Sequence, residues 1–152
     1  MNLFKTIDVS ASALTAHRLW LDVIADNLAN VNTTRTPEGG PYKRKMVIFE
    51  SRERVFPLSF GFRFPPSPKR ISDFRGEGVR VKEIVEDETP PRLVYDPYHP
   101  DANKDGYVAY PNVNVVREMV DMIAASRAYE ANLMAINTTR SMFMSALEVM
   151  RG

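Results

Sequence analysis

Proline and glycine are confined to the middle of this 152-residue chain, and this distribution limits the possible folds more than any other feature. All eleven prolines lie between Pro37 and Pro111, and six of the seven glycines lie between Gly39 and Gly106. Inside a helix, proline costs about 3 kcal/mol and glycine about 1 kcal/mol. Long helices are therefore allowed at both ends of the chain and disfavoured in its middle.

Both ends carry apolar residues at alternating spacings of four and three, the heptad pattern that keeps one seam of a helix against a partner helix. The first run extends from Leu3 to Val31 and the second from Val115 to Met150. If fully helical, the two runs are about 43 and 54 Å long, at 1.5 Å per residue. The seam residues expected to carry the contact are Leu14, Leu21, Ile24, Leu28, Met122, Tyr129, Leu133, Ile136, Phe143 and Leu147.

The middle of the chain predicts short strands and turns. β-Branched and aromatic residues indicate strands at Tyr42–Phe49, Val79–Val85 and Arg92–Tyr95. The basic run at 43–45 is expected to solvate a strand edge. Residues 56–70, FPLSFGFRFPPSPKR, are interpreted as loop packing or, less strongly, as a partner contact, and the stretch from Phe56 to Phe74 as a whole matches no known pattern.

The expected fold class is α+β, with long N- and C-terminal helices that pair as a coiled coil and a small β-rich middle segment. The expected domain bounds are 1–36 for the first helix and its Asn-rich end, 37–111 for the strands and loops, and 112–152 for the second helix. No window reaches about 18 uninterrupted apolar residues, and Lys5 and Asp8 interrupt the apolar start. Neither a transmembrane helix nor a secretory signal is therefore predicted.

No catalytic, cofactor or metal site is expected from the sequence. The absence of cysteine excludes disulfides and thiolate ligands, and the net charge of +1 gives no broad case for nucleic acid. His17 and His99 lack a ligand set, and His17 falls on the heptad seam, where a polar residue is expected to fix register or to contact a partner. Residues Asp101 to Gly106 match half of a calcium loop, but the closing position is Asn112, which favours an Asx-rich turn.

Residues 10–36, SASALTAHRLWLDVIADNLANVNTTRT, resemble the N-terminal signature of bacterial flagellar rod and hook proteins. The core of that signature is Asn27, Asn30, Asn32 and Thr34. Residues 95–143 resemble the proximal-rod branch of the same family. The resemblance implies a structural subunit, not an enzyme, that polymerises through its terminal helices into the hollow drive shaft of the basal body and transmits torque for motility.

The resemblance also implies where such a chain works and with what. It implies export by the flagellar type III apparatus without a cleaved signal peptide, and a location in the basal body spanning the periplasm. It implies contacts with the rod subunits FlgB, FlgF and FlgG, with the adaptor FliE and with further copies of the chain, but with no nucleic acid or small-molecule substrate. Three other classes stay open: a cytoplasmic coiled-coil adaptor or chaperone, a calcium-dependent module at Asp101–Gly106, and an unrecognised enzyme.

The asparagines of the signature need an explanation, because asparagine costs about 0.7 kcal/mol in a helix relative to alanine. Asn27 and Asn30 share one helix face and are expected to bond backbone groups of an adjacent subunit. Asn32, Thr33 and Thr34 are expected to end the helix by capping free carbonyls and to start the turn before Pro37. Glu130 and Asn132 of the second helix are candidates for the matching role, and both termini are expected to become ordered on assembly.

Overall fold

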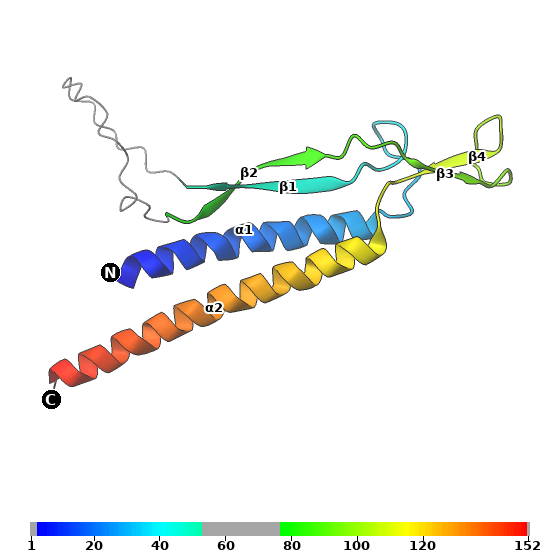
Figure 1. The fold of residues 1–152 in the computed structure, drawn as a ribbon. Helices are drawn as coiled ribbons and strands as arrows, with labels where there is room; N and C mark the ends of the chain where they lie inside the picture. Colours follow the sequence, from blue (N-terminus) through cyan, green and yellow to red (C-terminus); the bar gives the residue numbers. More distant parts are fainter. Residues whose placement is uncertain (1–2, 53–76, 152) are drawn as a thin grey trace, which may run out of the picture.

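A computed structural model describes residues 3–52 and 77–151 of the chain (Figure 1). The elements follow in the order α1 (Leu3–Ala29), β1 (Lys45–Ser51), β2 (Val79–Glu86), β3 (Arg92–Tyr95), β4 (Tyr107–Tyr110) and α2 (Val115–Arg151). This arrangement confirms the predicted α+β class with a long helix at each end. The segment from 56 to 74 lies outside the described residues, so its interpretation stays a prediction.

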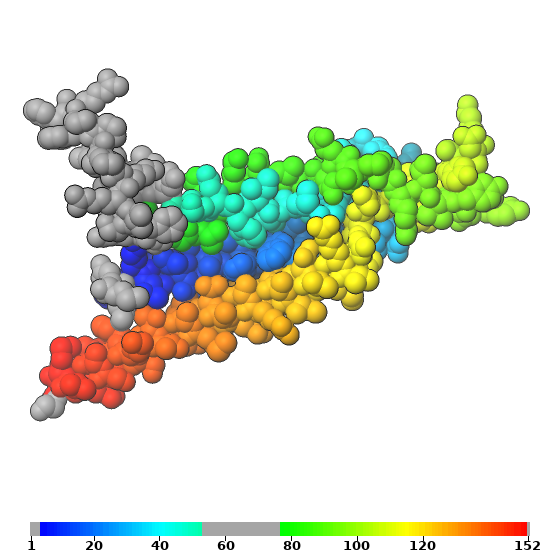
Figure 2. All heavy atoms as spheres, viewed as in Figure 1, coloured from blue at the N-terminus to red at the C-terminus, as the bar shows by residue number. Residues whose placement is uncertain are grey.

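The two end helices run side by side in opposite directions (Figure 1). α1 has 27 residues and α2 has 37, and the rings of Phe4 and Phe143 lie 6.3 Å apart between their centroids. Figure 2 shows that the C-terminal end of α2 continues past the start of α1. The predicted pairing of the ends is present, whereas the regular knobs-into-holes packing of a coiled coil stays a prediction.

The strands form two separate antiparallel pairs. β1 and β2 pair with a register shift between Ile48 and Phe49, and this ribbon lies along α1 (Figure 1). β3 and β4 pair from Arg92 with Tyr110 to Tyr95 with Tyr107. The first strand begins at Lys45 instead of Tyr42, because Tyr42 N donates to Thr33 O (3.1 Å) in the turn after α1. β4 was not predicted from the sequence.

Small residues of α1 allow the start of β2 to approach the helix closely. Ser12 and Ala16 are buried, and Ser12 Oγ donates to Val9 O (2.7 Å) and accepts from Val79 N (3.1 Å). Gly78 has a φ of 99°, and a Cβ atom at this position would collide with Ser12 Oγ. Glycine at 78 is therefore required by both the backbone conformation and the packing.

We expect Gly78→Ala to lower the free energy of unfolding by about 2 kcal/mol, measured by urea denaturation, through backbone strain and a forced shift of Ser12. Gly39→Ala is the matched control, because Gly39 has a φ of 92° and nothing within 4 Å of an added Cβ. The control carries only the backbone cost, about 1 kcal/mol. Equal losses in the two variants would contradict close packing of β2 on α1.

Among the described residues, neither helix combines the length and the apolar character needed to cross a membrane.

Candidate functional site

A buried polar cluster joins the end of α1, the start of β1 and the first turn of α2. It consists of Asn27, Tyr42, Arg44 and Glu118, and both Asn27 and Glu118 are only 1% exposed. Glu118 Oε1 accepts from Arg44 Nε (2.6 Å), and its Oε2 accepts from Asn27 Nδ2 (3.2 Å). Three segments that are far apart in the sequence are thereby held together at one end of the helix pair.

Both the amide nitrogen and the amide oxygen of Asn27 make hydrogen bonds within the chain. Its Nδ2 donates to Lys45 O (2.8 Å), and its Oδ1 accepts from Lys45 N (2.9 Å) and from the Tyr42 hydroxyl (3.0 Å). The amide therefore satisfies the first residue of β1 as a partner strand would. The bonds expected to reach an adjacent subunit are bonds within the chain, and a role of Asn27 in assembly stays a prediction.

The other residues of the Asn motif shape the turn after α1. Asn30 Nδ2 donates to Asp26 O (2.9 Å), a carbonyl that also accepts from Asn30 N (3.1 Å), while Asn32 lies exposed. Thr34 Oγ1 donates to Asp101 Oδ2 (2.8 Å) and so connects this turn to the loop between β3 and β4. The carbonyl capping expected of Asn32, and the assembly role of Asn30, Asn32 and Thr34, stay predictions.

The basic run at 43–45 does not simply solvate a strand edge. Lys43 is exposed and pairs with Glu86 (3.2 Å), but the Arg44 side chain is only 12% exposed. Besides Glu118, its guanidinium approaches Asp87 (3.9 Å) and Asp121 (3.8 Å). The interpretation of the run as an edge was therefore wrong for Arg44, because the carboxylates of α2 and of the turn after β2 draw it inward.

Tyr42 of the cluster and the neighbouring Asp87 have shifted pKa values. Burial, assisted by the nearby Asp26 carboxylate, raises the pKa of the Tyr42 hydroxyl, which stays a hydrogen-bond donor at neutral pH. Hydrogen bonds from the Thr89 backbone and hydroxyl lower the pKa of Asp87. Tyr42 is therefore a fixed donor within the cluster, and Asp87 is a stable carboxylate next to Arg44.

The buried residues of α2 lie one position before residues of the predicted heptad pattern, at 118, 125 and 139 instead of 119, 126 and 140. The buried residues of α2 are Glu118, Ala125 and Thr139, and they are spaced by seven and fourteen residues. Among the predicted seam positions, Ile24 is buried, Leu133 and Phe143 are 44% and 40% exposed, and the half-buried ones are Leu14, Leu21, Leu28, Met122, Tyr129, Ile136 and Leu147. Small and polar residues therefore hold α1 and α2 close, and part of the expected seam points outward.

The outward side of α2 carries an unusual amount of exposed apolar surface. We call this set the open face of α2; its residues are Val115, Val116, Met119, Val120, Ile123, Leu133, Met134, Met142, Met144, Val149 and Met150, all at least 38% exposed. Glu130 also lies exposed, and Asn132 Nδ2 donates to Ala128 O (2.8 Å) within the helix. A helix that is apolar on several faces is normally covered on several faces.

His17 faces the β1–β2 ribbon. Its ring lies 5.9 Å from Phe49 and 6.1 Å from Trp20, and Trp20 meets Phe49 edge to face. His17 Nδ1 is buried with no hydrogen-bond partner among the described residues, and burial lowers the pKa of His17. The expected role in helix register is therefore replaced by aromatic packing against β1.

We expect the stability of the chain to decrease as the pH falls below about 6.5, because the unfolded histidine then binds a proton that the folded one resists. Above that pH, His17 is neutral in both the folded and the unfolded chain, so it does not lower the stability. His17→Phe keeps the ring packing and removes the titration, so its stability between pH 7 and pH 5 should fall less, measured by thermal unfolding. Parallel pH profiles of the two proteins would contradict this role of His17.

The half calcium loop forms a turn stabilised by its own side chains. Asn103 Oδ1 accepts from Asp105 N (3.0 Å) and Tyr107 N (2.8 Å), and Gly106 has a φ of 81°. Asp101 accepts from Thr34, as described above. The interpretation as an Asx-rich turn is confirmed by these bonds.

A buried polar cluster holds the two long end helices together, and α2 leaves an apolar face uncovered. These features define a class of structural proteins that assemble through helices. Residues 7–35 match the family model for flagella basal body rod proteins, and residues 104–149 match the model for the C-terminal part of the flagellar basal body rod FlgEFG proteins.

Whole-chain relatives narrow the class. The chain is 51% identical to the flagellar basal-body rod protein FlgC of Borreliella burgdorferi over 100% of both chains. It is 46% identical to FlgC of Bacillus subtilis over 98% of this chain and 99% of the relative, and 38% identical to FlgC of Escherichia coli O6:H1 over 97% of each. The chain belongs to the FlgC family of flagellar basal-body rod proteins.

Proposed function

We propose that this chain is a structural subunit of the proximal rod of the bacterial flagellum, without enzymatic activity. Its end helices, the expected regions 1–36 and 112–152, form the rod core, and the β-rich region 37–111 lies outside them. The single observation that carries the proposal is the open face of α2, which a lone molecule leaves in water. Membership of the FlgC family supports the same role.

Assembly of the rod gives the open face a physical purpose. α2 is about 56 Å long at 1.5 Å per residue, and its exposed side chains include Met134 and Val149, which are 64% and 82% exposed. Neighbouring subunits that cover such side chains gain about 25 cal/mol for each Å² of apolar area removed from water. Packed helices of this length transmit torque through their stiffness, which requires no reactive group.

The resemblance to flagellar rod proteins supports a proposal for the partners, the export route and the location of the chain. FlgB, FlgF and FlgG are the proposed neighbours along the rod, and FliE is the proposed adaptor at its base. The chain passes through the flagellar type III export apparatus without a cleaved signal peptide and works in the basal body, across the periplasm.

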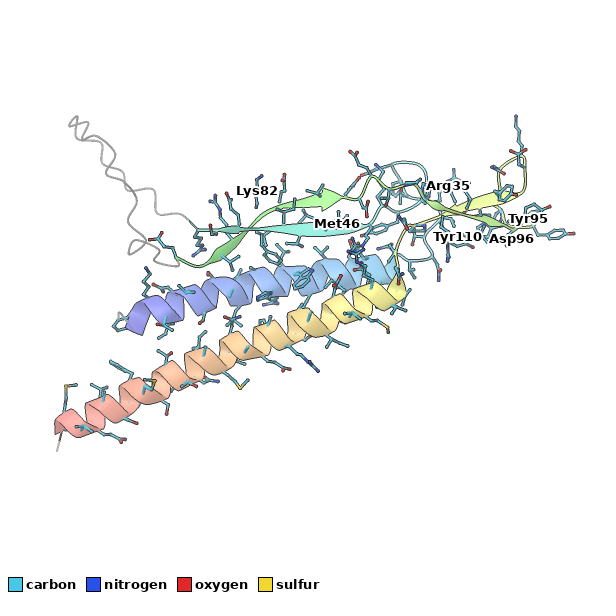
Figure 3. All side chains as sticks on the ribbon, viewed as in Figure 1. Arg35, Met46, Lys82, Tyr95, Asp96 and Tyr110 are labelled. Carbon is cyan, nitrogen blue, oxygen red and sulfur yellow. The ribbon has the colours of Figure 1, made fainter. Side chains whose placement is uncertain are left out.

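The proposal is tested by complementing a strain of the source bacterium that lacks the gene. Met134→Asp and Val149→Asp place a carboxylate on the open face, and we expect each to abolish swimming while changing the free energy of unfolding by under about 0.5 kcal/mol. Lys82→Asp is the matched control, because Lys82 lies exposed on β2, away from both helices (Figure 3). Normal swimming with Met134→Asp and Val149→Asp would contradict the proposal.

A further inference from the structure

Methionine is concentrated on α2. Six of the eight methionines of the chain lie on this helix, and five of the six are between 52% and 74% exposed. We call these five the α2 methionines; they are Met119, Met134, Met142, Met144 and Met150. Among the described elements α2 contacts α1 alone, so much of its surface faces solvent (Figures 1 and 2). A dissolved oxidant can therefore reach the α2 methionines in a single molecule.

Methionine is the side chain of this protein that a mild oxidant attacks first. The chain has no cysteine, whose thiolate would otherwise compete for the oxidant. The other methionines that the structure describes are less exposed, because Met122 is half-buried and Met46 on β1 is 37% exposed (Figure 3). Exposure therefore directs oxidation to the α2 methionines.

Oxidation by a peroxide makes these side chains polar. With hydrogen peroxide, the sulfur lone pair attacks one peroxide oxygen, an S–O bond forms and the O–O bond breaks. The second oxygen leaves as hydroxide and takes the proton of the transferred hydroxyl, so that one thioether and one peroxide give one sulfoxide and one water. The sulfur is oxidised by two electrons and the peroxide is reduced by two. The product is a polar, chiral side chain in place of a flexible apolar one.

A sulfoxide on the open face opposes burial of that face by a neighbouring subunit. Methionine fits irregular apolar surfaces because its side chain is unbranched and flexible. The sulfoxide oxygen is well hydrated, and its removal from water is unfavourable unless the neighbour supplies a hydrogen-bond donor. Apolar side chains packed against these positions supply none. Oxidation before assembly is therefore expected to weaken assembly.

We propose that the α2 methionines form an oxidation site for peroxides, at which sulfoxide formation in the unassembled chain prevents its addition to the rod. Assembled copies are protected, because neighbouring subunits cover the same side chains. This inference rests on the proposed function, since it requires an assembly in which the open face is covered. Methionine sulfoxide reductases reverse the change: two thiols supply the two electrons, and the oxygen leaves as water.

Peptide mass spectrometry after treatment with hydrogen peroxide tests the location and the protection of the site. In the purified full chain, the α2 methionines should gain sulfoxide about threefold or more faster than Met46 and Met122. In isolated basal bodies, the α2 methionines should gain it about threefold or more slowly than in the free chain. Equal rates in the two comparisons would overturn the inference.

Replacing every α2 methionine by leucine tests the effect on assembly. The variant Met119→Leu/Met134→Leu/Met142→Leu/Met144→Leu/Met150→Leu keeps an apolar side chain of similar volume at each position and removes the sulfur. Cells that lack the native gene produce either chain during exposure to hydrogen peroxide, and the amount of chain in their basal bodies is measured. We expect peroxide to lower this amount about tenfold for the native chain and to leave the variant unchanged. Equal decreases would show that other proteins are responsible and would overturn the inference.

Glutamine substitution imitates the sulfoxide without any oxidant. Met134→Gln/Met144→Gln places a polar oxygen at the end of a side chain of similar length, and we expect it to lower the amount of chain in basal bodies about tenfold. Lys82→Gln is the control, because Lys82 lies exposed on β2, away from both helices, and the native amount is expected (Figure 3). A native amount of Met134→Gln/Met144→Gln would contradict the inference.

The outcomes separate the oxidation site from the proposed function. Basal bodies that contain the chain but whose α2 methionines oxidise as fast as in the free chain overturn the oxidation site and leave the presence of the chain in the rod intact. Basal bodies without the chain, even in its unmodified form and without peroxide, overturn the rod role and the oxidation site with it.

Discussion

Replacing Glu118 by alanine is expected to lower the free energy of unfolding by about 3 kcal/mol. Glu118 is 1% exposed and accepts hydrogen bonds from Arg44 Nε and Asn27 Nδ2, so its loss takes one acceptor from a largely buried guanidinium and one from a buried amide. Removing one partner of a buried ion pair costs about 3–5 kcal/mol. The lower end applies, because Arg44 keeps two other carboxylates, Asp87 and Asp121, within 4 Å.

Urea denaturation of the monomer measures this loss. Glu130→Ala is the matched control, because Glu130 is an exposed glutamate on the same helix and should change stability by under about 0.5 kcal/mol. Glu118→Gln keeps an acceptor for Asn27 and should lie between the two. A loss for Glu118→Ala no greater than for Glu130→Ala would show that the polar cluster does not fasten α2.

The second large effect is expected for Asn27→Ala, with a loss of about 2–3 kcal/mol in the free energy of unfolding. The substitution removes both partners of the Lys45 backbone, at 2.8 and 2.9 Å, and leaves the buried Tyr42 hydroxyl with one acceptor fewer. Each buried polar group left without a partner costs about 1–3 kcal/mol. The gain in helix propensity from alanine, about 0.7 kcal/mol, offsets only part of this loss.

Asn30→Ala is the matched control for Asn27→Ala. Asn30 lies directly after the end of α1, and its side chain bonds only locally, to Asp26 and Thr33. We expect the monomer stability of Asn30→Ala to change by less than about 1 kcal/mol, because only local side-chain hydrogen bonds are lost and Asp26 O keeps its bond from the backbone N of residue 30. A stability of Asn27→Ala equal to or above that of the native chain would contradict the intrachain role and restore the sequence-based expectation that Asn27 serves assembly alone.

The two variants should also be energetically coupled, since Asn27 and Glu118 share a hydrogen bond. The double variant Asn27→Ala/Glu118→Ala is then expected to lose less than the sum of the single losses.

The two end helices could be predicted from the sequence, whereas the polar cluster could not. Heptad spacing and the absence of proline and glycine identified both helices, because these signals are local. Glu118 and Arg44 are 74 residues apart, and nothing in either sequence neighbourhood indicates that they meet. The partial signal was the cost of placing Asn27 in a helix, which identified an unusual residue but not its partner Lys45.

The seam prediction shows a second limit of sequence patterns. The pattern placed Leu133 and Phe143 in the contact between the helices, because apolar residues were assumed to face the partner helix. Phe143 does meet Phe4 of α1, with 6.3 Å between the ring centroids, but Leu133 is 44% exposed, and the buried residues of this part of α2 are Ala125 and Thr139. A pattern cannot distinguish the face that packs within the molecule from the face kept for neighbours when both are apolar, and the low polarity of the outward side of α2 creates this ambiguity.

The measurement that tests the central claim most directly is quantitative mass spectrometry of detergent-extracted basal bodies from the source bacterium. A structural rod subunit should be present at several copies per particle, in a fixed ratio to the ring and hook proteins. Absence of the chain from these particles, with the whole pool free in the cytosol, would contradict the claim and favour a cytoplasmic coiled-coil adaptor.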